Sequence, residues 1–530
     1  MKRSNEPTKT KKAMKTMKYF LSMAALALVG AMTVSCSSDD NIIDQPQQPE
    51  TKNNVVTLTT TVSLDGGDAT RALSSTGVKT FAVGETMAIY YWKNKGNDHE
   101  KAVSAPLTAG DITNGGKSAT FTFTLDNPYK DMSVSYVYPA AMANADFTPN
   151  YDALYNNQDG TLATLASNFD FCTKSGAWNG DALPSLTLEN QLAILALTLK
   201  NSTGSCDITS TITGVTLSDG TNSYAVNRSA AAGPIYVAIR PTSSATIDVT
   251  ATDGTNEYRK TLSGKTYAAN NGYNVTWKMS PIISLSGRTY LDDELVIADG
   301  YIVTGHATAY SCKVAVADGA TVTLRDVEND NGNLVPGSAC PGIRCIGDAT
   351  IILEGDNTVK GGSTYAGIYV PEGKTLTIRG TGSLTVTGGS GGAGIGGNSE
   401  GNCGSIVISG GTITATGGSH GAGIGLGYSS EGNCGDITIS GGTVTATGCD
   451  EAPGIGGPNA YFQNITITNG VTKVTVYKGS SSTYSIGTSE IDDEGYYGAI
   501  TIGGTEYFND GYFDNDGNSY LQTSPLIYQP

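Results

Sequence analysis

The chain has 530 residues, of which 49 are Asp or Glu and 32 are Lys or Arg, for a formal net charge of −17. A surface this acidic repels nucleic acid, and no Lys or Arg occurs between Thr381 and Thr472 to offset it. The composition therefore excludes a nucleic-acid partner. Three histidines and the absence of any C-x-x-C pattern also argue against a zinc site.

The first predicted element is an export signal at residues 1–36. A lysine-rich stretch precedes the apolar run YFLSMAALALVGAMTV, which is shorter than the roughly 20 residues of a membrane-spanning helix. Cys36 stands at the expected cleavage point, as in bacterial lipoproteins, and CSSDD at 36–40 resembles the export signal of Bacteroidetes surface lipoproteins. We expect Cys36 to carry lipid, to anchor the protein in the outer membrane and to leave it exposed at the cell surface.

The chain after the anchor changes from a tether to β-structure. Residues 37–53 are polar and contain proline, which favours a flexible linker. Residues 54–280 consist of short β-branched and aromatic runs separated by Gly, Asn, Asp and Pro, the pattern of antiparallel strands. The most apolar run, from Leu192 to Lys200, predicts a central core strand. One β-sandwich or two are expected here.

Several motifs occur in an order that resembles the fimbrillin-like proteins of Bacteroidetes, whose members include type V pilus subunits. They are ATRAL at 69–73, FAVGETMAIYYW at 81–92, SYVYPA at 135–140, LENQLAILALTLK at 188–200 and YAANNGYNVTWKM at 267–279. In such subunits a protease cuts after an arginine near the early strand, and a neighbouring subunit's strand replaces the lost one. The resemblance implies that Arg71 is this processing site and that pilus subunits are partners. Arg71 could otherwise be an ordinary solvated loop residue.

The second half of the chain repeats itself. Gly-Ile pairs recur at residues 342, 367, 394, 423 and 454, and GNCGSIVISGGTITATGG from 401 is followed 31 residues later by GNCGDITISGGTVTATG. Periods of 20–50 residues are typical of solenoids. The strand-like alternation within each copy predicts a parallel β-helix over residues 281–530, with residues 480–530 as its last coil and cap. A large domain after residue 280 favours a pilus tip, an accessory subunit or a non-polymerising relative over a stalk subunit.

Alternation also predicts which side chains face the β-helix core. Ile406, Ile408, Ile413 and Ala415 share one side, and Ile437, Ile439, Val444 and Ala446 are their counterparts in the next copy. The glycine pairs at 410–411 and 441–442 are expected at corners. The threonines at 412, 414, 416, 443, 445 and 447 face outward, where they either keep the surface wet or contact an ordered polar partner such as a glycan.

Two equivalent turns form the candidate ligand site. They contain Glu400 and Asn402 in one copy, and Glu431 and Asn433 in the next. If stacked, these side chains either hold Ca²⁺, form an acid/base pair, or serve as plain polar turns. No other cofactor is expected. Of the eight cysteines after Cys36, some are expected to pair, although the sequence does not show which.

These features favour a binding protein over an enzyme. Polysaccharide lyases with a β-helix need a basic catalytic residue, and the repeat core offers only Asp436, Asp450 and Glu451. The expected function is that of a surface adhesin or a pilus tip or accessory subunit, whose β-helix is presented for attachment, with host or dietary glycans as candidate partners. The alternatives are a polysaccharide-active lyase or hydrolase, and a purely structural spacer.

Overall fold

The computed structural model describes residues 54–64, 80–93, 98–146, 148–180, 182–288, 294–307, 313–331, 339–428, 432–458, 461–488, 498–509 and 512–530. The predicted signal, the tether, Cys36, Arg71 and Glu431 lie outside these ranges. Within them the chain is almost entirely β-structure, with short helices at α1 (Asp152–Asn156), α2 (Leu162–Asn168) and α3 (Gly517–Gln522). No helix in these ranges is both long enough and apolar enough to cross a membrane.

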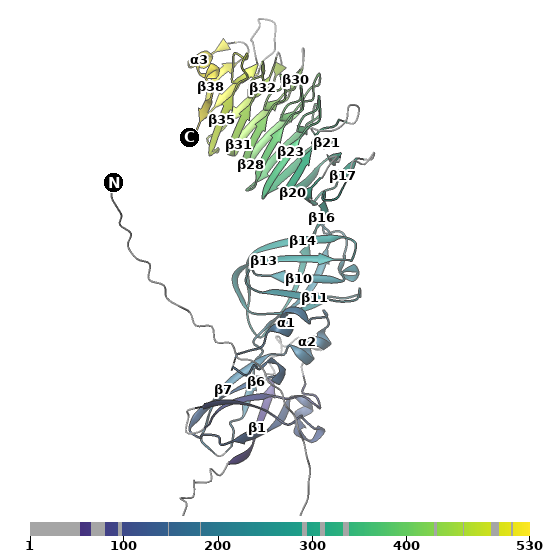
Figure 1. Cartoon of the computed structure of the whole chain (residues 1–530), viewed down its shortest axis with the longest axis vertical. Coiled ribbons are helices and arrows are strands. Elements are labelled where there is room, and N and C mark those ends of the chain that lie inside the picture. The colour runs from purple at the N-terminus through teal and green to yellow at the C-terminus, as the bar shows by residue number, and fades with distance from the viewer. Residues whose placement is uncertain are drawn as a thin grey trace, which may run out of the picture. The chain divides into compact units, whose positions relative to one another are not determined.

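The first β-sandwich holds two four-stranded sheets (Figure 1). One sheet has the order β4 (Ile112–Thr113), β5 (Ser118–Asp126), β1 (Val55–Leu64) and β8 (Leu186–Leu188). The other has the order β3 (Asp98–Val103), β2 (Ala88–Lys93), β6 (Met132–Tyr138) and β7 (Cys172–Trp178). Alternating side chains such as Phe121, Phe123 and Leu125 of β5 are fully buried between the sheets. The period-2 pattern of these runs is therefore what forms this core.

The second β-sandwich is built around a second hydrophobic core, which Tyr90 and Val137 of the first sandwich also join. Its smaller sheet is built on β9 (Ala193–Lys200), between β12 (Ile235–Ile239) and β15 (Asn271–Lys278). The other strands are β10 (Gly214–Ser218), β11 (Ser223–Asn227), β13 (Thr242–Thr252) and β14 (Glu257–Tyr267). The continuously apolar run from Leu192 is thus a central strand, as predicted, and of the two alternatives left open by the sequence the structure has two sandwiches.

One strand connects the second sandwich to the β-helix. β16 (Ser280–Ser284) pairs antiparallel with β14 and parallel with β18 (Ile302–His306). The predicted change of architecture at residue 280 falls at the first residue of β16. The β-helix is therefore joined to the sandwich by backbone hydrogen bonds as well as by the chain.

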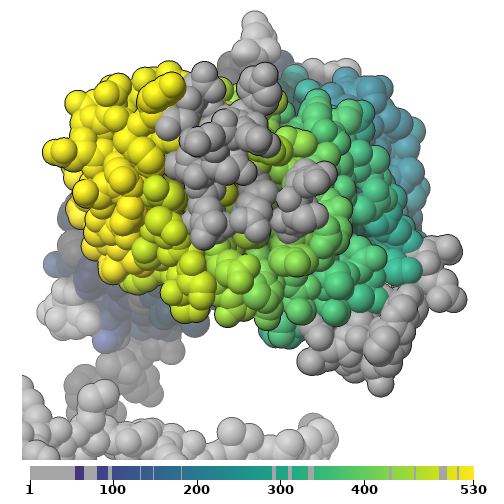
Figure 2. All heavy atoms as spheres, turned by 90° about the horizontal axis from the view of Figure 1, so that it is seen from above, coloured from purple at the N-terminus to yellow at the C-terminus, as the bar shows by residue number. Residues whose placement is uncertain are grey.

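The β-helix has three rows of parallel strands, visible as successive coils in Figure 1 and as bands in chain order in Figure 2. The first row is β20 (Ala320–Asp330), β22 (Ala349–Glu354), β25 (Thr375–Gly380), β28 (Ser405–Thr416), β31 (Ile437–Thr447), β34 (Ile465–Ile467) and β37 (Ile500–Ile502). The second adds β23 (Asp356–Lys360), β26 (Ser383–Thr387) and β35 (Lys473–Tyr477) to the later halves of β20, β28 and β31.

The third row contains the recurring Gly-Ile pairs. It runs through β17 (Leu295–Ile297), β19 (Val314–Val316), β21 (Ile343–Cys345), β24 (Ile368–Tyr369), β27 (Ile395–Gly396), β29 (Ile424–Gly425), β32 (Ile455–Gly457) and β36 (Ile486–Thr488). A Cβ at Gly394 would lie 2.6 Å from the carbonyl oxygen of Gly423, its counterpart in the next coil. Glycine repeats at this position because the stacked backbones leave no room for a side chain.

The core consists of identical positions stacked in register. Ile406 pairs with Ile437, which pairs with Ile465, and all three are fully buried. Val444 and Ala446 are likewise buried, whereas the intervening Thr445 is half-exposed. The predicted inward and outward sets are confirmed.

The glycine pairs bend single strands. Gly411 and Gly442 have φ of 89° and 81°, and the β28–β31 register shifts between Ser409 and Thr412. They lie within β28 and β31, so each predicted corner is a bend inside one continuous strand. Glycine adopts this φ without the clash that a Cβ would bring.

The C-terminal residues close the last coils. β40 (Leu526–Tyr528) pairs antiparallel with β35, and β38 (Thr505–Asn509) pairs antiparallel with β37. Tyr507 stacks on Tyr520 with ring centroids 4.6 Å apart. These antiparallel strands occupy backbone groups that would otherwise form an open sheet edge.

Replacing Ile439 by Asp is expected to unfold the β-helix readily, whereas Thr445→Asp should not. Ile439 is fully buried between Ile408 and Ile467, so the new carboxylate must be desolvated or protonated, at a cost of several kcal/mol. The half-exposed Thr445 should lose well under about 1 kcal/mol. Thermal melts of the two variants and the parent protein provide the measurement. Equal losses would contradict the inward and outward assignment.

Candidate functional site

The structure brings two of the four predicted turn residues together. Asn402 Oδ1 accepts a hydrogen bond from the Asn433 backbone N–H at 2.8 Å, and Asn402 Nδ2 donates to Glu372 Oε2 at 2.9 Å. Glu400 is exposed, and Glu431 lies outside the described residues. Calcium binding at this turn stays a prediction. Among the described residues, no group of three or more His, Cys, Asp or Glu is placed to hold a metal ion.

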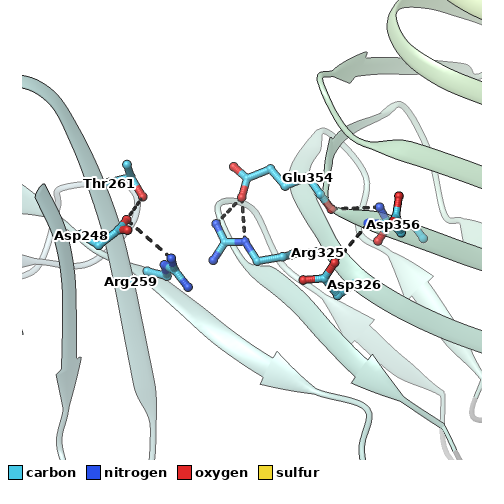
Figure 3. Close-up of polar contacts among 8 residues, drawn as sticks. Asp248, Arg259, Thr261, Arg325, Asp326, Glu354 and Asp356 are labelled. Carbon is cyan, nitrogen blue, oxygen red and sulfur yellow. Dashed lines mark hydrogen bonds and ion pairs between the residues drawn. The ribbon is translucent and has the colours of Figure 1, made fainter. Parts of the chain in front are cut away.

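The Asn402 contact belongs to a series of side-chain links between coils. Backbone N–H groups donate to a carboxylate one coil earlier in the pairs Asp348 to Asp318, Thr375 to Asp348, and Asn464 to Asp436, at 2.8 to 2.9 Å. Figure 3 shows two more links, between Asp326 and Asp356 and between Arg325 and Glu354. Asp318, Asp326, Asp348 and Asp436 therefore satisfy backbone donors, and all of these contacts hold neighbouring coils together.

A disulfide joins the same pair of turns. Cys403 and Cys434 are bonded across adjacent coils, with Cα atoms 4.5 Å apart and 31 residues between them in sequence. Both are buried. Cys206, Cys345 and Cys449 have free thiols, and burial raises the pKa of the Cys345 thiol to about 12. Cys345 is therefore an apolar core residue. The pairing of Cys403 with Cys434 is the feature that the sequence did not specify.

A groove of about 890 Å³ opens beside this disulfide. It crosses four successive coils, and we name it the disulfide groove. Its lining comes from the turns 372–375, 403–405, 433–435 and 461–463. Asn433 and Cys434 pair with Tyr461 and Phe462 of β33 (Tyr461–Phe462), through β30 (Asn433–Cys434). The stacking of coils thus converts four separate turns into one continuous surface.

The chemistry of the disulfide groove is polar with an aromatic contribution. Asn433 and Gln463 are exposed amides, Thr375 and Ser405 are half-buried hydroxyl residues, and Glu372 is an exposed carboxylate. The half-buried Tyr461 packs against the core, and the neighbouring Phe462 is buried. Amides and hydroxyls both donate and accept hydrogen bonds. The arrangement suits a ligand that presents hydroxyl groups and a weakly apolar face.

Sequence reasoning found Asn433 but missed Glu372, Tyr461 and Gln463. These three residues occupy turns that share no motif with the Gly-Asn-Cys repeat, so no motif marks them as neighbours. The repeat length is the signal that could have placed Tyr461 and Gln463 beside Asn433. The segment Tyr461-Phe462-Gln463 follows residues 432–434 at about one coil's distance and therefore stacks on them.

A second candidate surface is the outward face of the second row. Thr358, Thr385, Thr414 and Thr445 stack in register, and all four remain at least partly exposed. The adjacent column holds Thr387, Thr416 and Thr447 between Lys360 and Tyr477. The predicted threonine ladder is therefore present as a flat array, and its threonines carry no charge.

The early strand β1 lies inside its sheet. It pairs antiparallel with β5 from Val55 to Ser63 and parallel with β8 from Val62 to Leu64. Its inward residues Leu58 and Val62 are buried in the first core. Loss of β1 would uncover both neighbouring strand edges and this apolar row. The predicted cut at Arg71 itself lies outside the described residues.

Comparison with known proteins supports the repeat. Residues 406–428 and 437–459 match the family model described as a beta helix repeat. The first segment contains the inward residues of β28 and all of β29. The second contains β31 and β32. The predicted fold class, all-β with a C-terminal parallel β-helix, is confirmed. A search of curated proteins finds no match.

Solved structures of fimbrial and putative cell adhesion proteins resemble part of the chain. The tip fimbrial protein Mfa3 from Porphyromonas gingivalis, with a C-terminal truncation, is 10% identical with a TM-score of 0.24, over 42% of this chain and 95% of that one. A putative cell adhesion protein from Bacteroides uniformis is 16% identical with a TM-score of 0.25, over 42% and 96%. A fimbrial assembly protein from Parabacteroides distasonis is 12% identical with a TM-score of 0.24, over 42% and 91%.

Replacing Cys403 by Ser is expected to destabilise the β-helix by roughly 2–4 kcal/mol, because the disulfide closes a long loop in the unfolded chain. The matched control is Cys206→Ser, which changes an exposed free thiol and should have little effect. Urea unfolding with and without reductant measures both. If the reductant lowers the midpoint of the Cys403→Ser variant as much as that of the parent, the disulfide is not the stabilising element.

Proposed function

We propose that the protein is a lipid-anchored surface adhesin, in which the two sandwiches form the base and the β-helix carries the attachment surface. The observation that carries the proposal is the hydrogen-bonded path from β14 through β16 to β18, which makes the β-helix a sheet-connected extension of the base. Glycans on host tissue or in the diet are the proposed targets. The protein acts at the tip of a pilus, as an accessory subunit, or alone.

The surface of the β-helix supports attachment to uncharged polymers. The threonine array offers hydroxyl groups at regular intervals, about 4.8 Å from coil to coil. A stretch of 90 residues without a single Lys or Arg, from 382 to 471, forms the middle coils. Neither anionic polysaccharide nor nucleic acid would be attracted to such a surface. Neutral glycans would meet no electrostatic barrier there.

An enzymatic role is the second candidate, and the disulfide groove is the feature that favours it. Most glycoside hydrolases use two carboxylates that flank the scissile bond. Among the described lining residues, Glu372 is the one carboxylate, and it accepts a hydrogen bond from Asn402. This chemistry favours binding without cleavage. A structural spacer, the third candidate, would require no such groove.

The position of β1 supports the pilus version of the proposal. Because β1 lies between β5 and β8, its removal would open a strand-sized gap in the middle of a sheet. A donated strand could restore both ladders and the buried apolar row. At the other end of the chain, β40 is already paired with β35 in the cap. The protein is therefore proposed to accept a strand rather than to donate its own C-terminus, as suits a tip.

Cys36→Ala should abolish fatty-acid labelling and remove the protein from the cell surface, because no other cysteine stands at a cleavage point. Cells carrying the variant should then adhere less to plates coated with xylan or desialylated mucin. Metabolic labelling, surface immunodetection and counts of adherent cells measure the three effects. Equal labelling of parent and variant would overturn the proposal that Cys36 carries the lipid anchor. Loss of the protein from the cell surface with unchanged adherence would overturn the proposed adhesin function.

Arg71→Ala should block conversion of the monomer into an associating form by a trypsin-like protease. Cleavage after Arg71 removes residues 37–71 and with them β1, which exposes the edges of β5 and β8. Size-exclusion chromatography of cut and uncut protein, with an added strand peptide, gives the readout. A cut protein that stays monomeric and captures no peptide would contradict the pilus role and leave a surface lipoprotein that does not assemble.

A further inference from the structure

We propose that the disulfide groove binds a short segment of a neutral, linear oligosaccharide that lies along the β-helix axis. This inference rests on the proposed attachment to glycans and assigns a site to it. The groove is separate from the threonine array, since none of the array's threonines is among the described residues that line it.

The shape of the groove sets the form of the ligand. Its lining spans four coils, and three spacings of about 4.8 Å give a length of roughly 14 Å. The volume of about 890 Å³ lies in the range of small-molecule sites, which is about 300–1,000 Å³. A groove this long and open at the surface suits a chain of a few sugar rings rather than one ring. Successive rings would meet equivalent turns of successive coils.

Unused hydrogen-bonding groups point to a hydroxyl-rich ligand. The side chains of Thr375, Ser405, Asn433 and Gln463 have no hydrogen-bond partner in the described part of the chain, although Asn433 uses its backbone N–H. Each of these side chains donates and accepts, as a sugar hydroxyl does. The contrast with Asn402 is informative, because both amide atoms of Asn402 are engaged by Glu372 and Asn433. Four free polar groups along one groove are therefore available to a ligand.

The apolar part of the groove suits the C–H face of a sugar ring. Tyr461 lines the groove, is half-buried and packs on the core. Behind it, Phe462 is buried and lies 6.2 Å from the ring of Phe508. An aromatic side chain that lines a groove offers apolar surface to a ligand with an apolar face.

Charge decides between neutral and acidic sugars. Glu372 is the charged residue of the described lining, and the chain has a net charge of −17. The nearby Lys374 lies 3.7 Å from the carboxylate of Asp318 and is paired with it. A uronic acid or sulfated sugar placed in this groove would face a carboxylate without a matching cation. The ligand is therefore a neutral glycan.

The test uses the mature chain, residues 37–530 with Cys36 absent, and isothermal titration with linear tetrasaccharides. The neutral probes are xylotetraose, cellotetraose, mannotetraose and β-1,3-linked glucotetraose, and the acidic probe is tetragalacturonate. At least one neutral probe should bind, and tetragalacturonate should not. Tyr461→Ala should weaken that binding at least tenfold and Gln463→Ala several-fold, whereas Tyr461→Phe should keep most of it. Gln463 is exposed, so its variant tests the groove without a change in folding.

The control variant is Thr255→Lys, at an exposed position of the second sandwich, which should leave tetrasaccharide binding unchanged. The alternative site is tested by Thr385→Lys and Thr414→Lys on the threonine array. If these variants abolish binding and Tyr461→Ala does not, the glycan site is the array, the groove assignment is wrong and the proposed attachment stands. Binding of tetragalacturonate alone, or of no probe, overturns the groove assignment as well. The adherence of Cys36→Ala cells is measured independently. The two experiments therefore distinguish a wrong groove assignment from a wrong adhesin proposal.

Discussion

The β-helix depends on one constraint, which is that each coil must place its apolar residues directly above those of the coil before it. A single coil exposes too much of its apolar row to be stable, so stability comes from contacts between neighbours. Ile406, Ile437, Ile465 and Ile500 form one such column, and backbone hydrogen bonds join every step. The links from side chains at the turns add to this stacking by satisfying backbone donors that the strands leave over.

The same constraint determines where function can lie. In a strand, every inward residue fixes its neighbours as outward, so the core rows automatically generate flat outer rows such as the threonine array. The turns are less restricted, because their side chains need not alternate between the core and the surface. The disulfide groove arises there, from Tyr461 and Gln463 in one turn and from residues of three earlier coils. The disulfide groove is thus assembled across coils and does not belong to one repeat.

Both ends of the β-helix are covered by strands of a different kind. At its start, β16 bridges β14 of the second sandwich and β18 of the first coils. At its end, β38 and β40 run antiparallel to the last parallel strands. An uncovered parallel edge would invite pairing with another chain. The second sandwich therefore covers the first strand edge of the β-helix through β16.

The sequence by itself determined the all-β class, the β-helix, its inward residues such as Ile439 and its Gly-Ile row, because alternation and repeat length are local properties that stacking merely repeats. Whether the first half holds one sandwich or two was decided by long-range pairings such as Val62 with Leu186. The tertiary structure alone paired Cys403 with Cys434 and gathered Glu372, Tyr461 and Gln463. Those neighbours depend on the exact length of each coil, and a change of one residue in a turn would bring different side chains together.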